Sequence, residues 1–154
     1  MTADYRHRIR LRVNGLLVED DALLLVQLKA PTREEPIWMP PGGSVDFGEH
    51  MEEALARELQ EETGLTIEAG PLRYVNQFVE PPYHAVEFYF DCHSISGELR
   101  LGKDPEEDGG PQRLLDVKFV PLSQLRQMPV EPPFLRNHFP DEYKELPLAS
   151  RYFA

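Results

Sequence analysis

Hydrophobic and polar positions alternate strictly over residues 8–13, where Arg, Ile, Arg, Leu, Arg and Val follow one another. A period of two is typical of a β-strand with one solvated face. Apolar residues continue over 16–18 and again over 22–28, and the polar residues 19–21 between them favour a tight turn. The pattern therefore predicts a β-hairpin in the N-terminal part of the chain.

A loop and then a helix are predicted to follow this hairpin. Residues 30–43 include Pro31, Pro36, Pro40 and Pro41 together with two glycines, which favour a loop or a broken edge strand. A capping-box spacing at 46–49 predicts that a helix starts there and runs over 47–63. Gly64 is the residue type that usually follows the last turn of a helix.

The rest of the chain alternates short apolar segments with polar or proline-rich ones. These segments predict strands over 65–68, 72–79, 85–90 and 117–120, a polar loop over 102–112, and short helices starting at 121–125 and covering 131–139. Because one helix is inserted among strands without strict alternation, we expect one α/β domain over 1–154, with a mixed sheet and helices on its faces. Residues from about 140 to 154 are expected to form a peripheral tail.

Composition narrows the class of partner. The chain has 154 residues, with 27 Asp and Glu against 16 Lys and Arg, which gives a formal net charge of −11. Binding to duplex nucleic acid or to anionic lipid depends mainly on Lys and Arg, so we expect neither partner. Cys92 has no second cysteine to pair with, and apolar runs stay shorter than a bilayer span. We therefore expect a cytoplasmic protein.

The predicted helix departs from the usual separation of apolar and charged positions. At about 100° per residue, Glu58, Glu61 and Glu62 fall on the same side as the apolar residues of the first half, Met51 and Leu55. Carboxylates on a core-facing side repel one another and lose hydration, so they need protons or cations. Their oxygens suit Mg²⁺ or Mn²⁺ better than zinc. The alternative is a solvated acidic face paired with nearby Lys or Arg.

These residues resemble the signature of the Nudix hydrolase family, G-x5-E-x7-R-E-U-x-E-E-x-G-U, where U is a bulky aliphatic residue. Every defined position is matched, by Gly43, Glu49, Arg57, Glu58, Leu59, Glu61, Glu62, Gly64 and Leu65. The resemblance implies an α/β/α sandwich around a mixed sheet. It also implies Mg²⁺- or Mn²⁺-dependent hydrolysis of a nucleoside diphosphate linked to another moiety, such as an ADP-ribose-like compound or a nucleoside triphosphate.

The resemblance further implies roles for individual residues. Glu58 and Glu62 would be metal ligands, and Glu61 would be a further ligand or the base that activates water. The carbonyl of Gly43 would complete the coordination, and Arg57 would orient a carboxylate of the motif through an ion pair. A pyrophosphate approaching a chain of net charge −11 needs such cations, because they reverse the local field.

Outside the motif, the candidates for metal and substrate binding are less specific. An acidic residue of a later segment could act as base or extra ligand, and the candidates are Glu106, Glu107, Asp108 and Asp116. Arg12, on one strand face with two other arginines, could contact phosphates, although a plain exposed basic face is the alternative. Stacking on a base could use aromatic side chains that are otherwise core residues: Trp38, Tyr74, Phe78 and Tyr83.

Two other classes of function stay open. A Nudix-fold module that binds a nucleotide without hydrolysing it is expected to lack motif carboxylates, and this chain lacks none of them. An acidic domain used only for protein contacts would need no metal. Many family members pair as dimers, so a homodimer is a further alternative, but the sequence specifies no interface. The expected partner is a small nucleoside diphosphate derivative.

Overall fold

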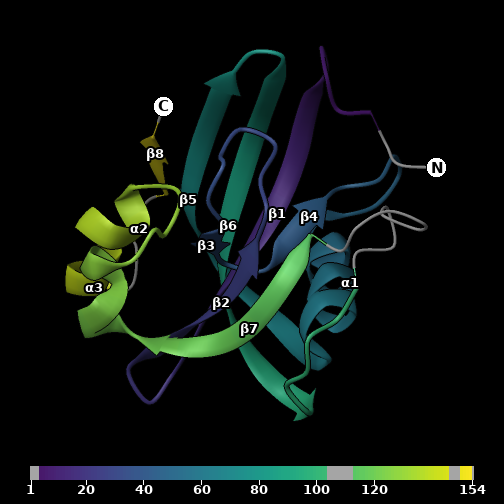
Figure 1. Cartoon of the computed structure of the whole chain (residues 1–154). Helices are drawn as coiled ribbons and strands as arrows, with labels where there is room; N and C mark the ends of the chain where they lie inside the picture. The colour runs from purple at the N-terminus through teal and green to yellow at the C-terminus, as the bar shows by residue number, and fades with distance from the viewer. Residues whose placement is uncertain (1–3, 104–112, 146–149, 154) are drawn as a thin grey trace.

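The computed structural model describes residues 4–103, 113–145 and 150–153. In these residues an eight-stranded sheet lies between helices on its two sides (Figure 1). The strands are β1 (Ile9–Glu19), β2 (Ala22–Leu28), β3 (Ile37–Met39), β4 (Gly42–Ser44), β5 (Leu65–Glu80), β6 (Tyr83–Gly97), β7 (Leu114–Pro121) and β8 (Arg151–Phe153). The helices are α1 (Met51–Thr63), the 3₁₀ helix η2 (Leu122–Gln127), α2 (Phe134–Asn137) and α3 (Phe139–Glu142).

The sheet is mixed, as predicted. Its main order is β3-β2-β1-β6-β5-β8, with β4 paired to β1 and β7 paired to β2. β1 and β6 are parallel, as are β5 and β8, whereas the other pairs are antiparallel. Figure 1 shows α1 on one side of the sheet and α2 and α3 on the other. The α/β/α arrangement implied by the family resemblance is therefore confirmed.

Two hydrophobic cores explain why β1 and β2 read as continuous apolar runs. Leu17 and Leu24 belong to the core under α1, together with Leu55 of that helix. Their neighbours Leu16 and Leu23 point the other way, into the core that η2, α2 and α3 cover. Because side chains alternate along a strand, a strand covered on both faces needs apolar residues at every position.

The predicted hairpin is confirmed, and other strands are longer than predicted. β1 and β2 pair across a tight turn at Asp20 and Asp21, both with positive φ, as such hairpin turns require. β5 is one bulged strand where two short ones were expected over 65–68 and 72–79. β6 extends to Gly97 because residues 92–97, polar for the most part, pair with the first residues of β5.

The predicted start of the helix is wrong by four residues. Gly48 has a φ of 84°, a left-handed conformation that no α-helix contains, so residues 46–49 form a turn. In that turn the Glu49 amide donates to the Asp46 carbonyl, and the Glu49 carboxylate accepts from the Asp46 amide. The helix begins at Met51, where Glu53 accepts from the His50 amide at 3.1 Å. Gly64 ends the helix as predicted, with a φ of 76°.

The C-terminal part packs against the sheet. The helix expected over 131–139 is divided into α2 and α3, and the one expected from 121–125 is the 3₁₀ helix η2. Within the segment expected to be a peripheral tail, β8 lies at the sheet edge and pairs with β5. Phe153 of β8 stacks on Phe134 with ring centroids 4.7 Å apart, and Arg73 donates to the carbonyl of Glu142. Every helix within the described residues is too short or too polar to cross a bilayer.

Candidate active site

A cavity of about 420 Å³ lies against the face of the sheet that carries Arg10 and Arg12. Among its described lining residues, five are Lys or Arg and four are Glu: Arg10, Arg12, Lys29, Arg33, Arg113, Glu58, Glu62, Glu87 and Glu131. In the whole chain, 27 acidic residues outnumber 16 basic ones, whereas in this lining five basic residues outnumber four acidic ones. The lining is therefore richer in cations than the chain as a whole. Such a cavity is suited to a ligand that combines anionic and apolar parts.

Two buried carboxylates of α1 form one end of the cavity. Glu58 and Glu62 are each only 7% exposed and line the cavity from the side of α1 that also carries the core residues Ala54 and Leu55. Glu61, which was predicted on the same side, is 29% exposed in its side chain and is not among the lining residues. The helix therefore presents two of its three predicted acidic residues to the cavity.

The Gly42–Gly43 pair is placed so that the carboxylates can approach the backbone. The amide of Gly42 donates to Glu62 Oε2 at 3.1 Å. A Cβ atom on Gly43 would lie 2.4 Å from Cδ of Glu58, well inside van der Waals contact. β4 holds both glycines against β1, where Gly43 pairs with Val13 and Gly42 with Asn14. Glycine is thus required by the close packing of β4 against α1, in a segment for which the sequence predicted a loop or a broken edge strand.

Arg57 connects the helix to the loop that precedes it. Its guanidinium donates to both oxygens of Glu49 at 2.9 Å, to Glu58 Oε1 at 2.9 Å, and to the Ser44 carbonyl at 3.1 Å. Glu61 Oε2 lies at 3.5 Å. These hydrogen bonds, first of all the one to Glu49, raise the pKa of Arg57 above its ordinary value. Arg57 therefore contacts Glu58, a carboxylate of the motif of the kind that it was predicted to orient.

The hydrogen bonds from Arg57 also lower the pKa of Glu49. Because the folded pKa lies below the ordinary value of 4.5, the unfolded chain binds more protons around that pH. The resulting stabilisation is complete above pH 4.5 and is lost as the pH falls through the folded pKa. We expect Glu49→Gln to lower the free energy of unfolding by about 1–2 kcal/mol at neutral pH, and by less in acid. Urea unfolding of both proteins across this range measures it, and parallel pH curves would contradict it.

The backbone after β6 satisfies the C-terminal end of α1. Arg100 and Gly102 donate their amides to the carbonyls of Thr63 and Glu62, at 2.9 and 2.8 Å. The last turn of α1 contains acidic residues and no basic ones, an arrangement that the helix dipole disfavours. These backbone hydrogen bonds compensate in part for that arrangement, since the last carbonyls of a helix otherwise need water or side chains.

The donor set fits a hard divalent cation. Glu58, Glu62 and the backbone of Gly43 present oxygen atoms, which are the ligands that Mg²⁺ and Mn²⁺ prefer. The missing side chain of Gly43 is itself part of the fit, because a Cβ there would collide with the Glu58 carboxylate. In the described parts of the chain, no three acidic, histidine or cysteine side chains are already gathered closely enough to hold a metal. Arg57 and Gly42 instead contact the two carboxylates.

A polar row crosses the sheet at the floor of the cavity. Register pairs Ser44 of β4 with Arg12 of β1, Arg12 with Glu87 of β6, and Glu87 with Asn76 of β5. Arg12 donates to Glu87 at 3.1 Å and Asn76 donates to Glu87 at 2.9 Å, so the buried carboxylate has two donors. Nε of Arg12 is buried and has no hydrogen-bond partner among the described residues. All four residues of this row line the cavity, and Ser44 follows Gly43, whose backbone lies against Glu58.

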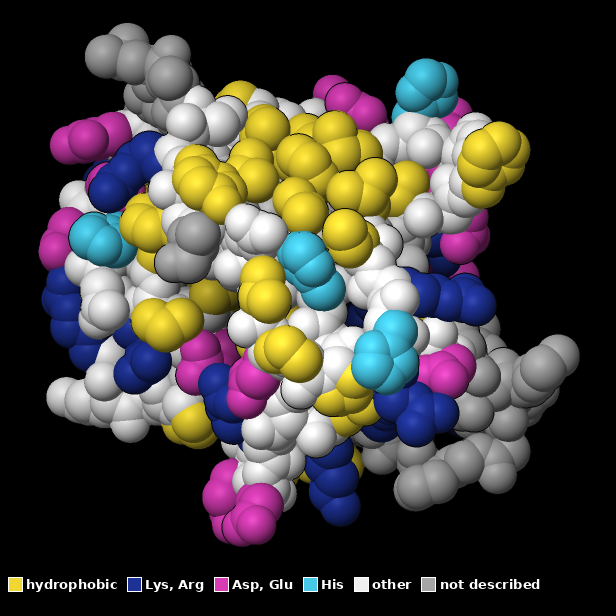
Figure 2. Space-filling view, turned by 90° about the horizontal axis from the view of Figure 1, so that it is seen from above, with side chains coloured by type: hydrophobic (Ala, Val, Ile, Leu, Met, Phe, Trp, Pro, Cys, Tyr) yellow, Lys and Arg dark blue, Asp and Glu magenta, His cyan; other side chains and the backbone are white. Residues whose placement is uncertain are grey.

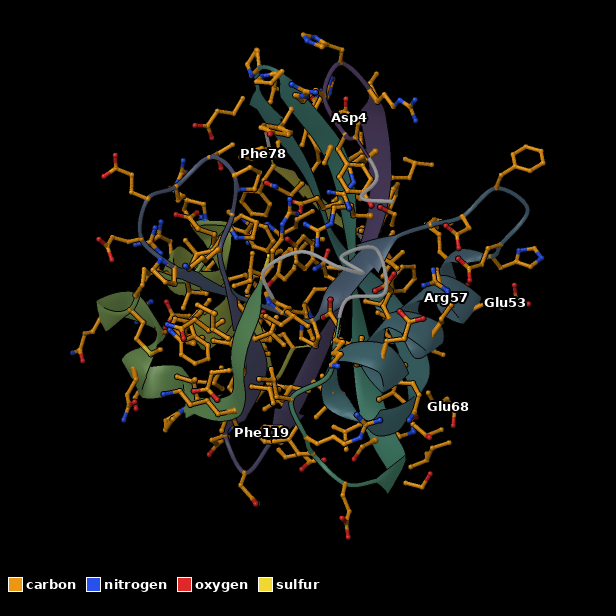
Figure 3. All side chains as sticks on the ribbon, turned by 45° about the vertical axis from the view of Figure 1, so that its right-hand side comes forward. Asp4, Glu53, Arg57, Glu68, Phe78 and Phe119 are labelled. Atoms are coloured by element: carbon orange, nitrogen blue, oxygen red, sulfur yellow. The ribbon has the colours of Figure 1, made fainter. Side chains whose placement is uncertain are left out.

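The structure places the predicted substrate-binding candidates in different environments. Arg12, Phe78 and Tyr83 line the cavity, whereas Trp38 does not. The Trp38 ring is 7% exposed and belongs to the core on the η2 side, with the ammonium of Lys118 4.7 Å from its centroid. Figure 3 shows Arg57 on α1 and Phe78 toward the far end of β5, so the site extends along the sheet.

Of the four later acidic candidates, Asp116 is within the described residues, and it does not line the cavity. Asp116 is exposed on β7, is absent from the lining, and accepts from its neighbouring amide of Val117. Glu106, Glu107 and Asp108 lie outside the described residues. The sequence reasoning missed Glu87 and Asn76. A signal for Glu87 was present, because it is the charged residue that interrupts the apolar run 85–90.

An α/β/α sandwich that carries the complete signature on a strand, loop and helix next to a cation-lined cavity defines a protein of the Nudix fold class. The family model of the NUDIX domain matches residues 8–141 of this chain. An ADP-ribose pyrophosphatase of Methanocaldococcus jannaschii is 35% identical over 97 residues, which are 62% of this chain and 57% of that protein. The chain thus spans little more than half of that relative's length.

Two further comparisons agree. The nucleoside triphosphatase NudI of Escherichia coli O139:H28 is 30% identical over 109 residues, covering 63% of this chain and 77% of that protein. The crystal structure of a MutT NUDIX hydrolase from Burkholderia pseudomallei has a TM-score of 0.60 and 28% identity, covering 75% of this chain and 85% of that one. The chain therefore belongs to the Nudix hydrolase family.

Proposed function

We propose that this protein is a divalent-metal-dependent pyrophosphohydrolase that cleaves a nucleoside diphosphate derivative. The observation that carries the proposal is the placement of Glu58 and Glu62, each 7% exposed, at one end of a cavity lined by five Lys or Arg side chains. The substrate is an ADP-ribose-like compound or a nucleoside triphosphate. The names of the archaeal and Escherichia coli relatives, a pyrophosphatase and a nucleoside triphosphatase, support both substrate types.

The residues that would hold Mg²⁺ or Mn²⁺ are Glu58 and Glu62, with the carbonyl of Gly43. Glu61 would be a further ligand or the base that takes a proton from water. Its carboxylate lies near that of Glu58, because the same nitrogen of Arg57 donates to both. When bound, the ion neutralises charge on the phosphate oxygens and lowers the pKa of a coordinated water.

The chain's own side chains position the substrate. Arg57 fixes Glu58 by donating to one of its oxygens while anchored on Glu49. Arg10, which donates to Ser44, and Arg12, which donates to Glu87, line the cavity and would bind phosphate oxygens there, since guanidinium groups match phosphate geometry. Phe78 and Tyr83 supply aromatic faces on which a base can stack.

A panel of nucleotides incubated with pure protein and Mg²⁺ tests the proposal. We expect release of nucleoside monophosphate from ADP-ribose, or of pyrophosphate from a triphosphate. ³¹P NMR detects these products. Absence of turnover together with a nucleotide-dependent rise in the melting temperature would favour the binding-module alternative. Absence of both turnover and stabilisation, with or without metal, would favour a domain that makes protein contacts only.

The metal assignment makes a prediction that does not depend on turnover. Ligands that bind only the folded state raise stability, by about 2.7 kcal/mol at a hundredfold excess over Kd, or roughly 5–10 °C in Tm for a domain of this size. We expect Mn²⁺ to raise the Tm of the wild type in this way and to raise that of Glu62→Gln much less. Asp116→Asn, which removes an exposed carboxylate outside the cavity lining, is the control and keeps the full rise. Equal rises in all three proteins would exclude Glu62 as a ligand.

A further inference from the structure

Glu87 places a buried carboxylate on the floor of the cavity. It is only 6% exposed and belongs to the polar row that crosses four adjacent strands. Figure 2 shows acidic side chains at the molecular surface on the side of the β5–β6 hairpin, next to basic ones, where water solvates them. Glu87 has lost most of that water, and a carboxylate in such a place needs hydrogen-bond donors instead.

Two side chains of the protein fix the orientation of this carboxylate. Asn76 Nδ2 donates to Glu87 Oε1 at 2.9 Å, and Arg12 Nη1 donates to Glu87 Oε2 at 3.1 Å. An ionised carboxylate has about four acceptor positions, so it can accept further hydrogen bonds beyond these two. Because Glu87 also lines the cavity, a ligand there can supply such donors.

Holding Arg12 in place does not by itself account for a charged residue at position 87. A negative charge beside a guanidinium weakens the attraction of that guanidinium for an anionic substrate. A neutral amide oxygen would accept from Arg12 without this disadvantage. A charged acceptor, by contrast, forms hydrogen bonds about twice as strong as a neutral one, which favours a ligand group that donates.

The position of Glu87 across the sheet indicates which part of the ligand that group belongs to. This step rests on the proposed function, which places the diphosphate near Glu58 and Gly43, beside β4. In the sheet β4 pairs with β1, and β1 pairs with β6. At about 4.8 Å per strand, Glu87 is about 10 Å from β4, with Arg12 between them.

The aromatic side chains of the cavity lie further along, toward the hairpin. Tyr83 precedes Glu87 by four positions on β6, about 13 Å, and Phe78 of β5 pairs with Ala85 between them. All of these residues line the cavity. Arg12, Glu87 and the aromatic pair therefore follow one another in the order in which phosphate, sugar and base follow one another in a nucleotide.

We propose that Glu87 accepts hydrogen bonds from the 2′- and 3′-hydroxyls of the nucleoside sugar and thereby selects ribonucleotides over 2′-deoxyribonucleotides. The two hydroxyls are neighbouring donors, and the two carboxylate oxygens can accept from both. An acidic residue binds the ribose 2′-hydroxyl in the same chemical manner in dinucleotide-binding folds. A site built to bind a hydroxyl discriminates against a substrate that lacks it, because its buried polar group is then left unpaired.

Steady-state kinetics with Mg²⁺ and the pairs ATP and dATP, GTP and dGTP, and CTP and dCTP test the proposal. We expect the wild type to favour each ribonucleotide in kcat/KM by at least about tenfold, the effect of a hydrogen bond to a charged group. Glu87→Gln keeps the shape of the side chain but removes its charge, and should lower this ratio at least about threefold.

Glu131→Gln is the matched control. It removes the same charge from the cavity lining but outside the polar row, at a residue whose amide donates to the Trp38 carbonyl. The ratio of ribonucleotide to deoxyribonucleotide should keep its wild-type value in this variant. If Glu87 acted only by holding Arg12, Glu87→Gln would weaken both members of each pair equally and leave the ratio unchanged.

Calorimetric titration measures the same selectivity without turnover. In Glu58→Gln, which we expect to turn over slowly, ribonucleotides should bind more tightly than deoxyribonucleotides, and adding Glu87→Gln should reduce the difference. Asn76→Ala keeps the charge but removes the donor to Oε1, so it should also lower the ratio and serves if Glu87→Gln fails to fold. Thermal unfolding establishes which variants are folded.

The outcomes separate this inference from the proposed function. Equal use of both sugars by the wild type, an unchanged ratio in Glu87→Gln, or an equal loss in Glu131→Gln would each overturn the role of Glu87, while nucleotide hydrolysis itself would stand. A wild type that neither hydrolyses nor binds any nucleotide would overturn both.

Discussion

Replacing Glu58 with glutamine is expected to lower kcat for a nucleotide substrate by at least about 100-fold, as removal of a single electrostatic contact at a reacting centre does elsewhere. Glutamine keeps the shape of the side chain and can still accept from Arg57 at the position where Glu58 Oε1 now lies 2.9 Å from that guanidinium. What it loses is the negative charge at the buried end of the cavity, which is the property that a divalent cation needs.

The fold should tolerate this substitution. Ion pairs that are not fully buried contribute about 1 kcal/mol or less, and the Arg57 side chain is 31% exposed and keeps its two hydrogen bonds to Glu49. Steady-state kinetics with Mg²⁺, together with thermal unfolding, separate loss of charge from loss of structure. Glu52→Gln, an exposed substitution in the first turn of α1, should retain the wild-type rate. A wild-type rate in Glu58→Gln would remove the catalytic assignment.

The sequence correctly predicted those features of the fold that depend on a few neighbouring residues. Gly64 ends α1 because its left-handed φ suits glycine, and Asp20 and Asp21 form a tight hairpin turn between two apolar runs. The start of α1 was not predictable in the same way. The capping spacing at Asp46 recurs at His50, and only the left-handed conformation of Gly48 distinguishes a turn from a helix there.

Long-range pairing decided what the local pattern could not. Residues 92–97 have little β-propensity, yet they extend β6 because the first residues of β5 lie alongside them. The same limitation applied to the site. The carboxylates of Glu58 and Glu62 could be placed on one side of a helix from their spacing, but the row of Ser44, Arg12, Glu87 and Asn76 depends on the register of four strands.

The aromatic side chains considered for base stacking also depend on long-range strand pairing. Trp38 and Tyr83 were equal candidates for stacking, because an aromatic residue in a strand can face either a core or a ligand. β3 pairs with β2, and Trp38 also bridges to Val130, which directs its ring into the core on the η2 side. Tyr83 begins β6 at the hairpin and lines the cavity. The face that each side chain occupies follows from strand order, which a single sequence does not specify.

Gly43→Ala is expected to reduce both activity and stability, although it adds a single methyl group. The new Cβ would lie 2.4 Å from Cδ and 2.5 Å from Oε1 of Glu58, so the carboxylate must leave its position. Displacement by about 1 Å in a catalytic geometry can cost on the order of 100-fold in rate. Overpacking of this kind also costs about 1–3 kcal/mol of folding free energy.

A second glycine separates these two effects. Gly70→Ala places a Cβ 3.0 Å from the backbone oxygen of Asp91, in a part of β5 away from the cavity, so it should destabilise the fold while kcat stays at the wild-type level. Thermal unfolding and kinetics of both variants measure the difference. If Gly43→Ala lost stability but kept its rate, as Gly70→Ala should, then the close approach of Gly43 to Glu58 would serve packing alone and the metal-binding role of this end of the cavity would have to be abandoned.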